Sequence, residues 1–326
     1  MKNKFRRRIQ IKIWPETQSY LPTVIPYERL NPNKANPIDF DFSNVSVVEA
    51  ASLNLLLINL IKLTSSLQNI DWDIKFSEVE NVNARLKEMK FFDIFPKIIP
   101  NNQLFWQTEI LEKKLSSLNF KKDSTIESFP LYHLSLSKAR ERRDVVEEFK
   151  DWLFLNLSKL KEKYNFKIHK LILILIEIAK NSADHTLNDA FFGMDIIYFN
   201  NYLTFQFSLG DLGDGINQTV RRKLKGMDEY KNKDSHLALT DSYIWALVTG
   251  FTSQAHSKIN RGIGIPTIVE VSRQIGLELS VFDAQSRGIF SRLDEVPTHT
   301  GLRKIFYSVG FNVGFYYYGT LKFKIQ

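Results

Sequence analysis

The densest apolar run of the chain occupies residues 171–176, where six consecutive aliphatic side chains lead into a line of polar ones. By periodicity alone this run fits a central strand as well as a buried helix. Because the chain continues through residue 185 without glycine or proline, we favour a helix. Glu177, Asn181 and His185 then follow at steps of four, so they share one face of that helix. We therefore expect a buried helix whose far end opens into a polar site.

The segment after this helix alternates between apolar and polar residues. Residues 202–209 read as a half-buried strand, and Asn200 and Asn201 join it to a strand at 191–199. Because asparagine tolerates positive φ, this two-residue connection predicts a hairpin. The other elements expected in the second half are helices at 138–161 and 265–274, the latter ended by Gly276, and strands at 129–136, 277–282, 305–309 and 315–325.

The first hundred residues predict a smaller set of strands and helices. Apolar alternation at 8–14 indicates a half-buried strand, after which five prolines break the chain into extended segments. Ser77 is expected to cap a helix at 78–90, with Glu80 at the capping-box position. The other elements expected here are strands at 38–45 and 72–76, a helix at 48–62, and a closing segment at 91–95 before Pro96.

Length and composition fit a division into two domains. The chain has 326 residues, of which 44% are hydrophobic and 25% charged, as in soluble globular proteins. A charged stretch at 101–125 has no apolar core of its own, so we interpret it as a linker. The expected domains are therefore residues 1–100 and residues 126–326, both of the α/β class.

Composition also excludes several classes of site. The chain has no cysteine, so disulfides and thiolate metal sites are absent. No apolar run reaches the roughly 18 residues of a membrane span, and the basic start lacks the apolar core of a secretory signal. We therefore expect a cytoplasmic protein without a membrane partner. The net charge of +8 comes from lysines spread over many segments, which favours solvated faces over nucleic-acid binding.

Two short motifs follow the central helix. The first, Asp211-Leu-Gly-Asp-Gly215, comes directly after the strand at 202–209. A carboxylate there can accept a hydrogen bond from an amino group, and the glycines permit a tight turn beside a flat ligand. The second, Arg261-Gly-Ile-Gly-Ile265, opens the helix at 265–274. Unpaired amides and the positive dipole end at a helix N-terminus suit phosphate groups.

In this order and at these separations, the polar helix face and the two motifs resemble the N-box and the two glycine boxes of the GHKL ATPases. The resemblance covers residues 126–326 and implies a two-layer α/β sandwich that binds ATP and Mg²⁺. It implies that Glu177 is the general base, that Asn181 holds Mg²⁺ and the nucleotide, and that Asp211 contacts adenine. The other nucleotide-contacting positions that it implies are Gly213, Gly215, Lys258, Arg261, Gly262, Gly264 and Thr320. His185 completes an E…N…H pattern found in many small members.

The first domain resembles a STAS domain, the fold of anti-anti-sigma factors, over about residues 38–96. In these factors a phosphorylatable serine follows an aspartate, whereas this chain has Glu49 followed by Ala50. Ser52 lies two positions later, where the family keeps a glycine. We therefore interpret this STAS-like domain as a docking module rather than a phosphorylation switch.

The leading functional hypothesis is a regulatory ATP-binding protein, Mg²⁺-dependent and ATP-hydrolysing, in which the nucleotide orders an insert at 217–260 and changes how a protein partner docks. The alternative is a protein serine/threonine kinase of the anti-sigma type that acts on a STAS-like partner. A nucleotide-independent scaffold is disfavoured because Glu177 and Asn181 are both present. The oligomeric state, including a homodimer, stays open. Walker, HExxH and GxSxG motifs are absent from the sequence.

Overall fold

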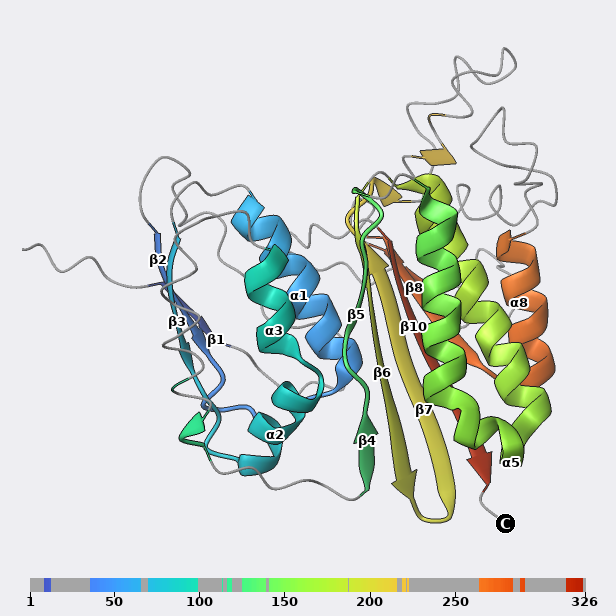
Figure 1. Ribbon diagram of the computed structural model, residues 1–326, viewed down its shortest axis with the longest axis horizontal. Helices are drawn as coiled ribbons and strands as arrows, with labels where there is room; N and C mark the ends of the chain where they lie inside the picture. The colour runs from blue at the N-terminus through green and yellow to red at the C-terminus, as the bar shows by residue number, and fades with distance from the viewer. Residues whose placement is uncertain are drawn as a thin grey trace, which may run out of the picture. The chain divides into compact units, whose positions relative to one another are not determined.

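The computed structural model describes residues 9–12, 36–65, 70–98, 113, 116–118, 125–138, 141–186, 188–215, 219–220, 222, 264–283, 288–290 and 315–324. The chain divides into two units. Unit 1 comprises residues 1–131, 193–197 and 309–311, and unit 2 comprises residues 132–192, 198–308 and 312–326. Each unit combines helices with a sheet, so the expectation of an α/β protein is confirmed at this level (Figure 1). Within the described segments, no helix has the length and apolar character needed to cross a membrane.

Unit 1 contains a three-stranded parallel sheet in the order β1-β2-β3. Its helices lie on one side of this sheet in Figure 1, and the core is formed by the apolar face of α1. These elements follow the predicted alternation of strands and helices closely. Their bounds are β1 Ile9–Lys12, β2 Asn36–Asp41, α1 Ala50–Ser65, β3 Ile70–Lys75, α2 Glu80–Glu88 and α3 Phe91–Ile98.

The start of α2 differs from the prediction. Val79 is the N-cap residue, with extended backbone angles, so the helix begins at Glu80 and Ser77 is not its cap. The Ser77 hydroxyl accepts a hydrogen bond from the Val79 N–H at 3.0 Å and donates one to the Val45 carbonyl at 2.6 Å. Ser77 therefore ties the preceding loop together, three residues before the helix begins.

A buried ion pair lies at the beginning of α1. Arg85 of α2 contacts Asp195 at 2.8 Å, and the Asp195 carboxylate also accepts the Ala50 N–H at 2.6 Å. All three residues belong to unit 1, which includes residues 193–197. Burial raises the pKa of neighbouring Glu49, and Asp195 adds to this while Arg85 opposes it. Glu49 and Ala50 thus lie beside a buried ion pair.

The larger sheet has seven strands in the order β4-β6-β7-β10-β8-β9, with β5 also paired to β6, and most of its residues belong to unit 2. The pairings within it are antiparallel. Its members are β4 Ile126–Ser128, β5 Tyr132–Leu134, β6 Ala190–Phe199, β7 Tyr202–Asp211, β8 Glu278–Asp283, β9 Gly288–Phe290 and β10 Phe315–Lys324. In Figure 1 the helices α5 (Arg142–His185) and α8 (Gly264–Ile275) lie on the same side of this sheet.

Two predicted strands need correction or fall outside the structure. Within the strand expected at 129–136, only β5, residues 132–134, is a strand, and a further short strand, β4, precedes the predicted range. Proline has no N–H to donate, and the Leu131 N–H donates to the Met89 carbonyl instead of to β6. The strand expected at 305–309, most of the linker at 101–125 and most of the insert at 217–260 lie outside the described residues.

The helical segment α5 reverses direction along its 44 residues. A straight helix of that length would separate its ends by roughly 66 Å. Instead, Arg142 Nη1 donates to the carbonyls of Ala183 and Thr186 at 3.0 and 2.8 Å. The rings of Phe154 and His169 lie 6.2 Å apart, which places the reversal between these residues. The two arms seen in Figure 1 correspond to the helices expected at 138–161 and 171–185.

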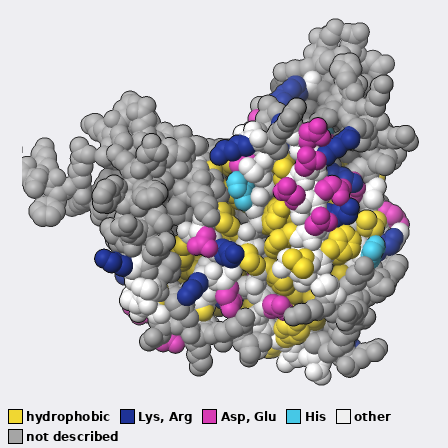
Figure 2. Space-filling model, in the orientation of Figure 1, with side chains coloured by type: hydrophobic (Ala, Val, Ile, Leu, Met, Phe, Trp, Pro, Cys, Tyr) yellow, Lys and Arg dark blue, Asp and Glu magenta, His cyan; other side chains and the backbone are white. Residues whose placement is uncertain are grey.

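Aromatic packing fixes the first arm of α5 on the sheet. Phe149, Phe192 and Phe207 are fully buried, with ring centroids 5.1 and 6.4 Å apart along the series. The opposite side of this arm is polar, and Figure 2 shows acidic side chains gathered over its first turns. The exposed acidic residues there are Glu141, Asp144, Glu147, Glu148 and Asp151. Negative charge near a helix N-terminus is stabilised by the helix dipole.

The second helix, α8, ends as predicted. Gly276 has a φ of 70°, a conformation that glycine adopts without a steric penalty. The Gly276 N–H donates to the Arg273 carbonyl, and the Leu277 N–H donates to the Ser272 carbonyl. These two bonds form a Schellman motif, which stops the helix before β8.

Candidate functional site

The hairpin of β6 and β7 carries the first glycine motif. Asn200 and Asn201 have φ values of 47° and 61°, as a type I′ turn requires. Along β7 the side chains of Leu203, Phe205, Phe207 and Leu209 are buried on one face. Asp211 continues this alternation and is only 6% exposed. The strand therefore delivers a buried carboxylate on the face that the helices cover.

Asp211 connects the turn that follows β7 to the end of α5. Its Oδ1 atom accepts the Gly213 N–H at 2.8 Å, which closes the turn. Its Oδ2 atom accepts a hydrogen bond from the Ser182 hydroxyl at 3.3 Å. A carboxylate offers about four acceptor positions, so these two bonds are compatible with a further donor.

Asn181 lies against the N-terminus of α8. Its side-chain Oδ1 atom is 2.8 Å from the point where a Cβ atom on Gly264 would stand. Its Nδ2 atom is buried and has no partner of good hydrogen-bond geometry among the described residues. The polar contact of this amide with the Tyr317 hydroxyl does not have good hydrogen-bond geometry, so an acceptor on a bound ligand would satisfy the amide better.

Tyr317 of β10 completes this group of side chains. Burial raises the pKa of its hydroxyl strongly, and the negative charge of Asp211 adds to the rise, while a polar contact with Asn181 opposes it. Tyr317 is opposite Leu209 in the sheet register, so its side chain is on the same face as Asp211. Asp211, Asn181 and Tyr317 thus share one polar neighbourhood within unit 2.

The two glycines of the first motif serve different needs. A Cβ atom on Gly213 would stand 2.7 Å from the Thr186 hydroxyl oxygen, so only glycine allows this close approach. Gly215 has a φ of 78°, in the left-handed region that side chains other than glycine rarely adopt. Thr186 follows the last residue of α5, so the turn after β7 packs directly against the end of that helix.

Glu177, the predicted general base, is one turn before Asn181 on α5. Its side chain is 28% exposed and pairs with Lys180 at 2.7 Å. Its ion pair is directed along α5 to Lys180 and not towards Asp211, and His185 on the same helix is exposed. The structure therefore places Glu177 at the partly open edge of the group rather than inside it.

Several other predicted site residues are not brought into this group. Lys258, Arg261 and Gly262 lie outside the described residues. Thr320 of β10 is opposite Gln206, so its side chain is on the other face of the sheet from Asp211. Its hydroxyl donates to the Tyr318 hydroxyl at 3.2 Å.

Sequence reasoning missed Ser182, Thr186 and Tyr317. Ser182 and Thr186 are one helical turn apart, so their small polar side chains share a face beside that of Asn181. Side chains in the run FYYYGTLKF point alternately to the two faces of the sheet. Because Tyr317 is opposite Leu209, it is the tyrosine whose side chain lies on the face of Asp211. The first signal was available in the sequence, whereas the second required the strand pairing.

The described residues contain no group of three or more histidine, cysteine, aspartate or glutamate side chains that could hold a metal ion. Mg²⁺ does not need such a group, because it often keeps several waters and takes the rest of its oxygens from substrate phosphates. A single amide oxygen such as Asn181 Oδ1 is therefore chemically compatible with it. The chain matches no protein-family model, and no curated protein is similar to it.

Proposed function

We propose that unit 2 binds ATP together with Mg²⁺, with the base at Asp211 and the phosphates near the N-terminus of α8. The observation that carries the proposal is the grouping of Asp211, Asn181 and Gly264. These residues are far apart in the sequence and come together through Ser182, Thr186 and Tyr317. Asp211 would bind the base, Asn181 would bind Mg²⁺, and Gly264 would leave room for the phosphates.

Asp211 is suited to hold the purine. Its carboxylate is buried and oriented by the Ser182 and Gly213 bonds, so it would accept a hydrogen bond from the adenine amino group without reorganising. A charged acceptor in a buried site makes a strong hydrogen bond, since water competes poorly there. Gly213 keeps the turn close to Thr186 and leaves room beside the carboxylate.

The N-terminus of α8 is suited to hold phosphates. The first amides of a helix have no partner within the helix, and the dipole there favours negative charge. Gly264 begins this helix with no side chain, directly beside the Asn181 amide. Bound Mg²⁺ would supply positive charge to the phosphate oxygens. Asn181 would present its side-chain oxygen to the ion.

Glu177 is suited to act as the general base for hydrolysis. It shares the helix face of Asn181 and remains partly exposed, so a water molecule could reach its carboxylate. In this structure the carboxylate already accepts a hydrogen bond from Lys180. Movement of Lys180 away from this carboxylate would leave the oxygen open to a water molecule, so the Lys180 contact would regulate the rate.

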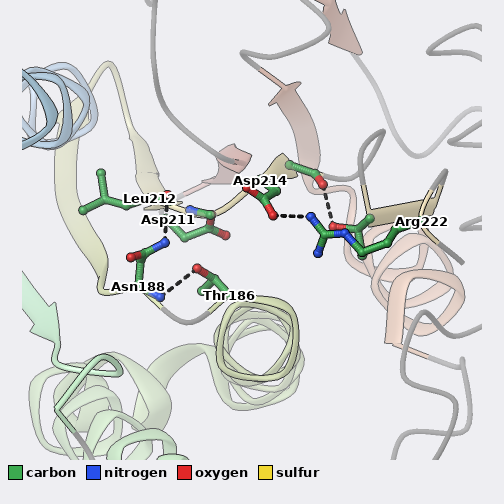
Figure 3. Close-up of polar contacts among 9 residues, drawn as sticks. Thr186, Asn188, Asp211, Leu212, Asp214 and Arg222 are labelled. Atoms are coloured by element: carbon green, nitrogen blue, oxygen red, sulfur yellow. Dashed lines mark hydrogen bonds and ion pairs between the residues drawn. The ribbon is translucent and has the colours of Figure 1, made fainter.

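The regulatory role rests on a contact between the base-binding turn and the insert. Arg222, within the insert at 217–260, pairs with Asp214 in the turn, as Figure 3 shows. The Thr219 hydroxyl also donates to the Gly215 carbonyl at 2.7 Å. A nucleotide at Asp211 would therefore act on the insert through this turn, and the insert would present the altered surface to a protein partner.

The proposal is tested by titrating fluorescently labelled ATP with Mg²⁺ against wild type, Asp211→Asn and Asp144→Asn. We expect Asp211→Asn to weaken binding by about 1–3 kcal/mol, because an amide is a poorer acceptor than a carboxylate. Asp144→Asn makes the same chemical change at an exposed residue on the first arm of α5 and should bind like wild type. Equal affinity for all three proteins would contradict the assignment of Asp211.

A further inference from the structure

The residues that follow α5 hold the turn after β7 through its backbone (Figure 3). The Asn188 side-chain amide donates to the Leu212 carbonyl at 3.2 Å, and the Leu212 N–H donates to the Asp189 carbonyl at 3.3 Å. Both polar groups of the Leu212 backbone are therefore held from the same side. We refer to Thr186, Asn188 and Asp189 as the clamp.

The clamp is ordered internally and at its helical end. The Asn188 N–H donates to the Thr186 hydroxyl at 3.0 Å, which closes a local turn. The Thr186 carbonyl accepts from Arg142 at 2.8 Å, and its hydroxyl lies against Gly213. The clamp thus connects the end of α5 to the turn that follows Asp211, so the position of that turn depends on the position of the helix end.

The other end of the clamp is anchored on β5. The Asp189 carboxylate contacts His133 Nε2 at 2.8 Å and accepts the Ser137 N–H at 2.8 Å. The His133 ring stacks on Phe191, with centroids 4.7 Å apart and planes 5° apart. Burial alone would raise the pKa of Asp189, but the bonds from His133 and Ser137 outweigh it and hold the pKa at about 2.

We propose that Asn188 and Asp189 are positioning residues that set purine specificity by fixing the location of the Asp211 carboxylate. This inference rests on the proposed function, because it assigns a role toward the nucleotide that Asp211 is expected to bind. A hydrogen bond discriminates between ligands only if its acceptor is held where the ligand presents its donor. Leu212 follows Asp211 directly, so release of the Leu212 backbone lets the carboxylate move.

The test compares ATP with purine riboside triphosphate, which lacks the amino group that Asp211 is expected to bind. Wild type should prefer ATP, and the ratio of the two dissociation constants measures the contribution of that amino group. Asn188→Ala should lower this ratio by about 3–10-fold, the effect of a hydrogen bond of ordinary strength. Its affinity for purine riboside triphosphate should change by less than about 2-fold, since that ligand does not use the Asp211 bond.

A matched control is Asn156→Ala on the first arm of α5. Asn156 also donates from its amide to a backbone carbonyl, that of Trp152 at 2.7 Å, but it has no contact with the clamp. This variant should keep the wild-type ratio. His133→Phe preserves an aromatic ring over Phe191 and removes only the bond to Asp189, so it should lower the ratio in the same direction as Asn188→Ala.

The outcomes separate the inference from the function on which it rests. A wild-type ratio retained in Asn188→Ala and His133→Phe would overturn the positioning role while leaving the nucleotide site intact. An equal loss of affinity for both ligands would also overturn it, because it would indicate a general structural role. If wild type itself did not prefer ATP, both the assignment of Asp211 and the positioning role would fail.

Discussion

The Oδ1 atom of Asn181 lies 2.8 Å from the point where a side chain on Gly264 would begin. This relationship joins two motifs separated by more than eighty residues of sequence. Contacts of that length are shorter than Cβ atoms tolerate, so the absence of a side chain at Gly264 is what allows α8 to start beside Asn181. The position of the helix N-terminus and the orientation of the amide are therefore coupled.

Gly264→Ala should weaken Mg²⁺-dependent nucleotide binding more than it affects folding. The new methyl group would displace the Asn181 amide, whereas alanine is a better helix former than glycine. We expect a roughly tenfold loss of affinity in the presence of Mg²⁺ and a change of less than about 1 kcal/mol in the free energy of unfolding. Thr267→Ala, an exposed position in the same turn of α8, is the control and should bind normally. Unchanged Mg²⁺-dependent affinity in Gly264→Ala would contradict the assignment of Asn181 to the nucleotide site.

Gly319→Ala should destabilise unit 2 strongly. Gly319 is opposite Phe207 in the sheet, and a Cβ atom there would overlap the Phe207 ring, which is fully buried. Overpacking of this kind typically costs about 1–3 kcal/mol. Thr320→Ala, the next residue on the other face, should cost less because it removes atoms rather than adding them. Urea unfolding measures both, and equal stability of the two variants would contradict the packing described for β10.

Much of the fold could be predicted from the sequence because its signals are local. The Asn200-Asn201 turn and the Gly276 cap depend on residues that accept positive φ, and both are present where expected. The helix N-cap at Ser77 was wrong because the loop from Val45 uses the serine hydroxyl instead. Helices were expected at 138–161 and 171–185, but it was not predicted that they form one segment, α5, or that this segment reverses direction.

The candidate site was less predictable, because much of it depends on pairing between distant segments. Tyr317 could not be chosen over Tyr316 or Tyr318 until the register with β7 was known, since all three are buried. Thr320 was expected in the site from its motif alone, and the same register places it on the other face. The clamp residues Asn188 and Asp189 look like an ordinary polar loop in the sequence.

Glu177→Gln separates hydrolysis from binding. A general base acts mainly in the transition state, so ATP affinity should stay nearly constant while turnover falls by roughly 10²–10⁴. Glu147→Gln is the matched control, because Glu147 pairs with Lys150 at 2.6 Å with the same spacing on the other arm of α5. Turnover is followed by release of the γ-phosphate. Wild-type turnover in Glu177→Gln would remove the catalytic role of this residue.

The same experiment distinguishes hydrolysis from protein phosphorylation. With radiolabelled γ-phosphate, a regulatory ATPase releases free phosphate, whereas the kinase alternative transfers label to a protein. The leading hypothesis predicts free phosphate and no label on this chain. Label on Ser52 would overturn the interpretation of unit 1 as a docking module.

Asp189 should make stability depend on pH in a defined window. Its pKa is held at about 2 in the folded protein, below the ordinary value of 3.8. A depressed carboxyl pKa contributes stability above the ordinary value, and this contribution is lost as the pH falls towards 2. The difference in unfolding free energy between wild type and Asp189→Asn should therefore be constant from pH 7 to 5 and shrink from pH 4 to 2. A difference that stayed the same at pH 3 as at pH 7 would contradict the pairing with His133 and Ser137.

The most direct test is a crystal structure of the protein with a non-hydrolysable ATP analogue and Mg²⁺. The proposed function predicts the adenine amino group within hydrogen-bond distance of the Asp211 carboxylate and the phosphates at the N-terminus of α8. It also predicts Mg²⁺ bonded to the Asn181 side-chain oxygen. A nucleotide bound elsewhere on the protein, or a nucleotide-saturated crystal in which no nucleotide atom lies within hydrogen-bond distance of the Asp211 carboxylate, would contradict it.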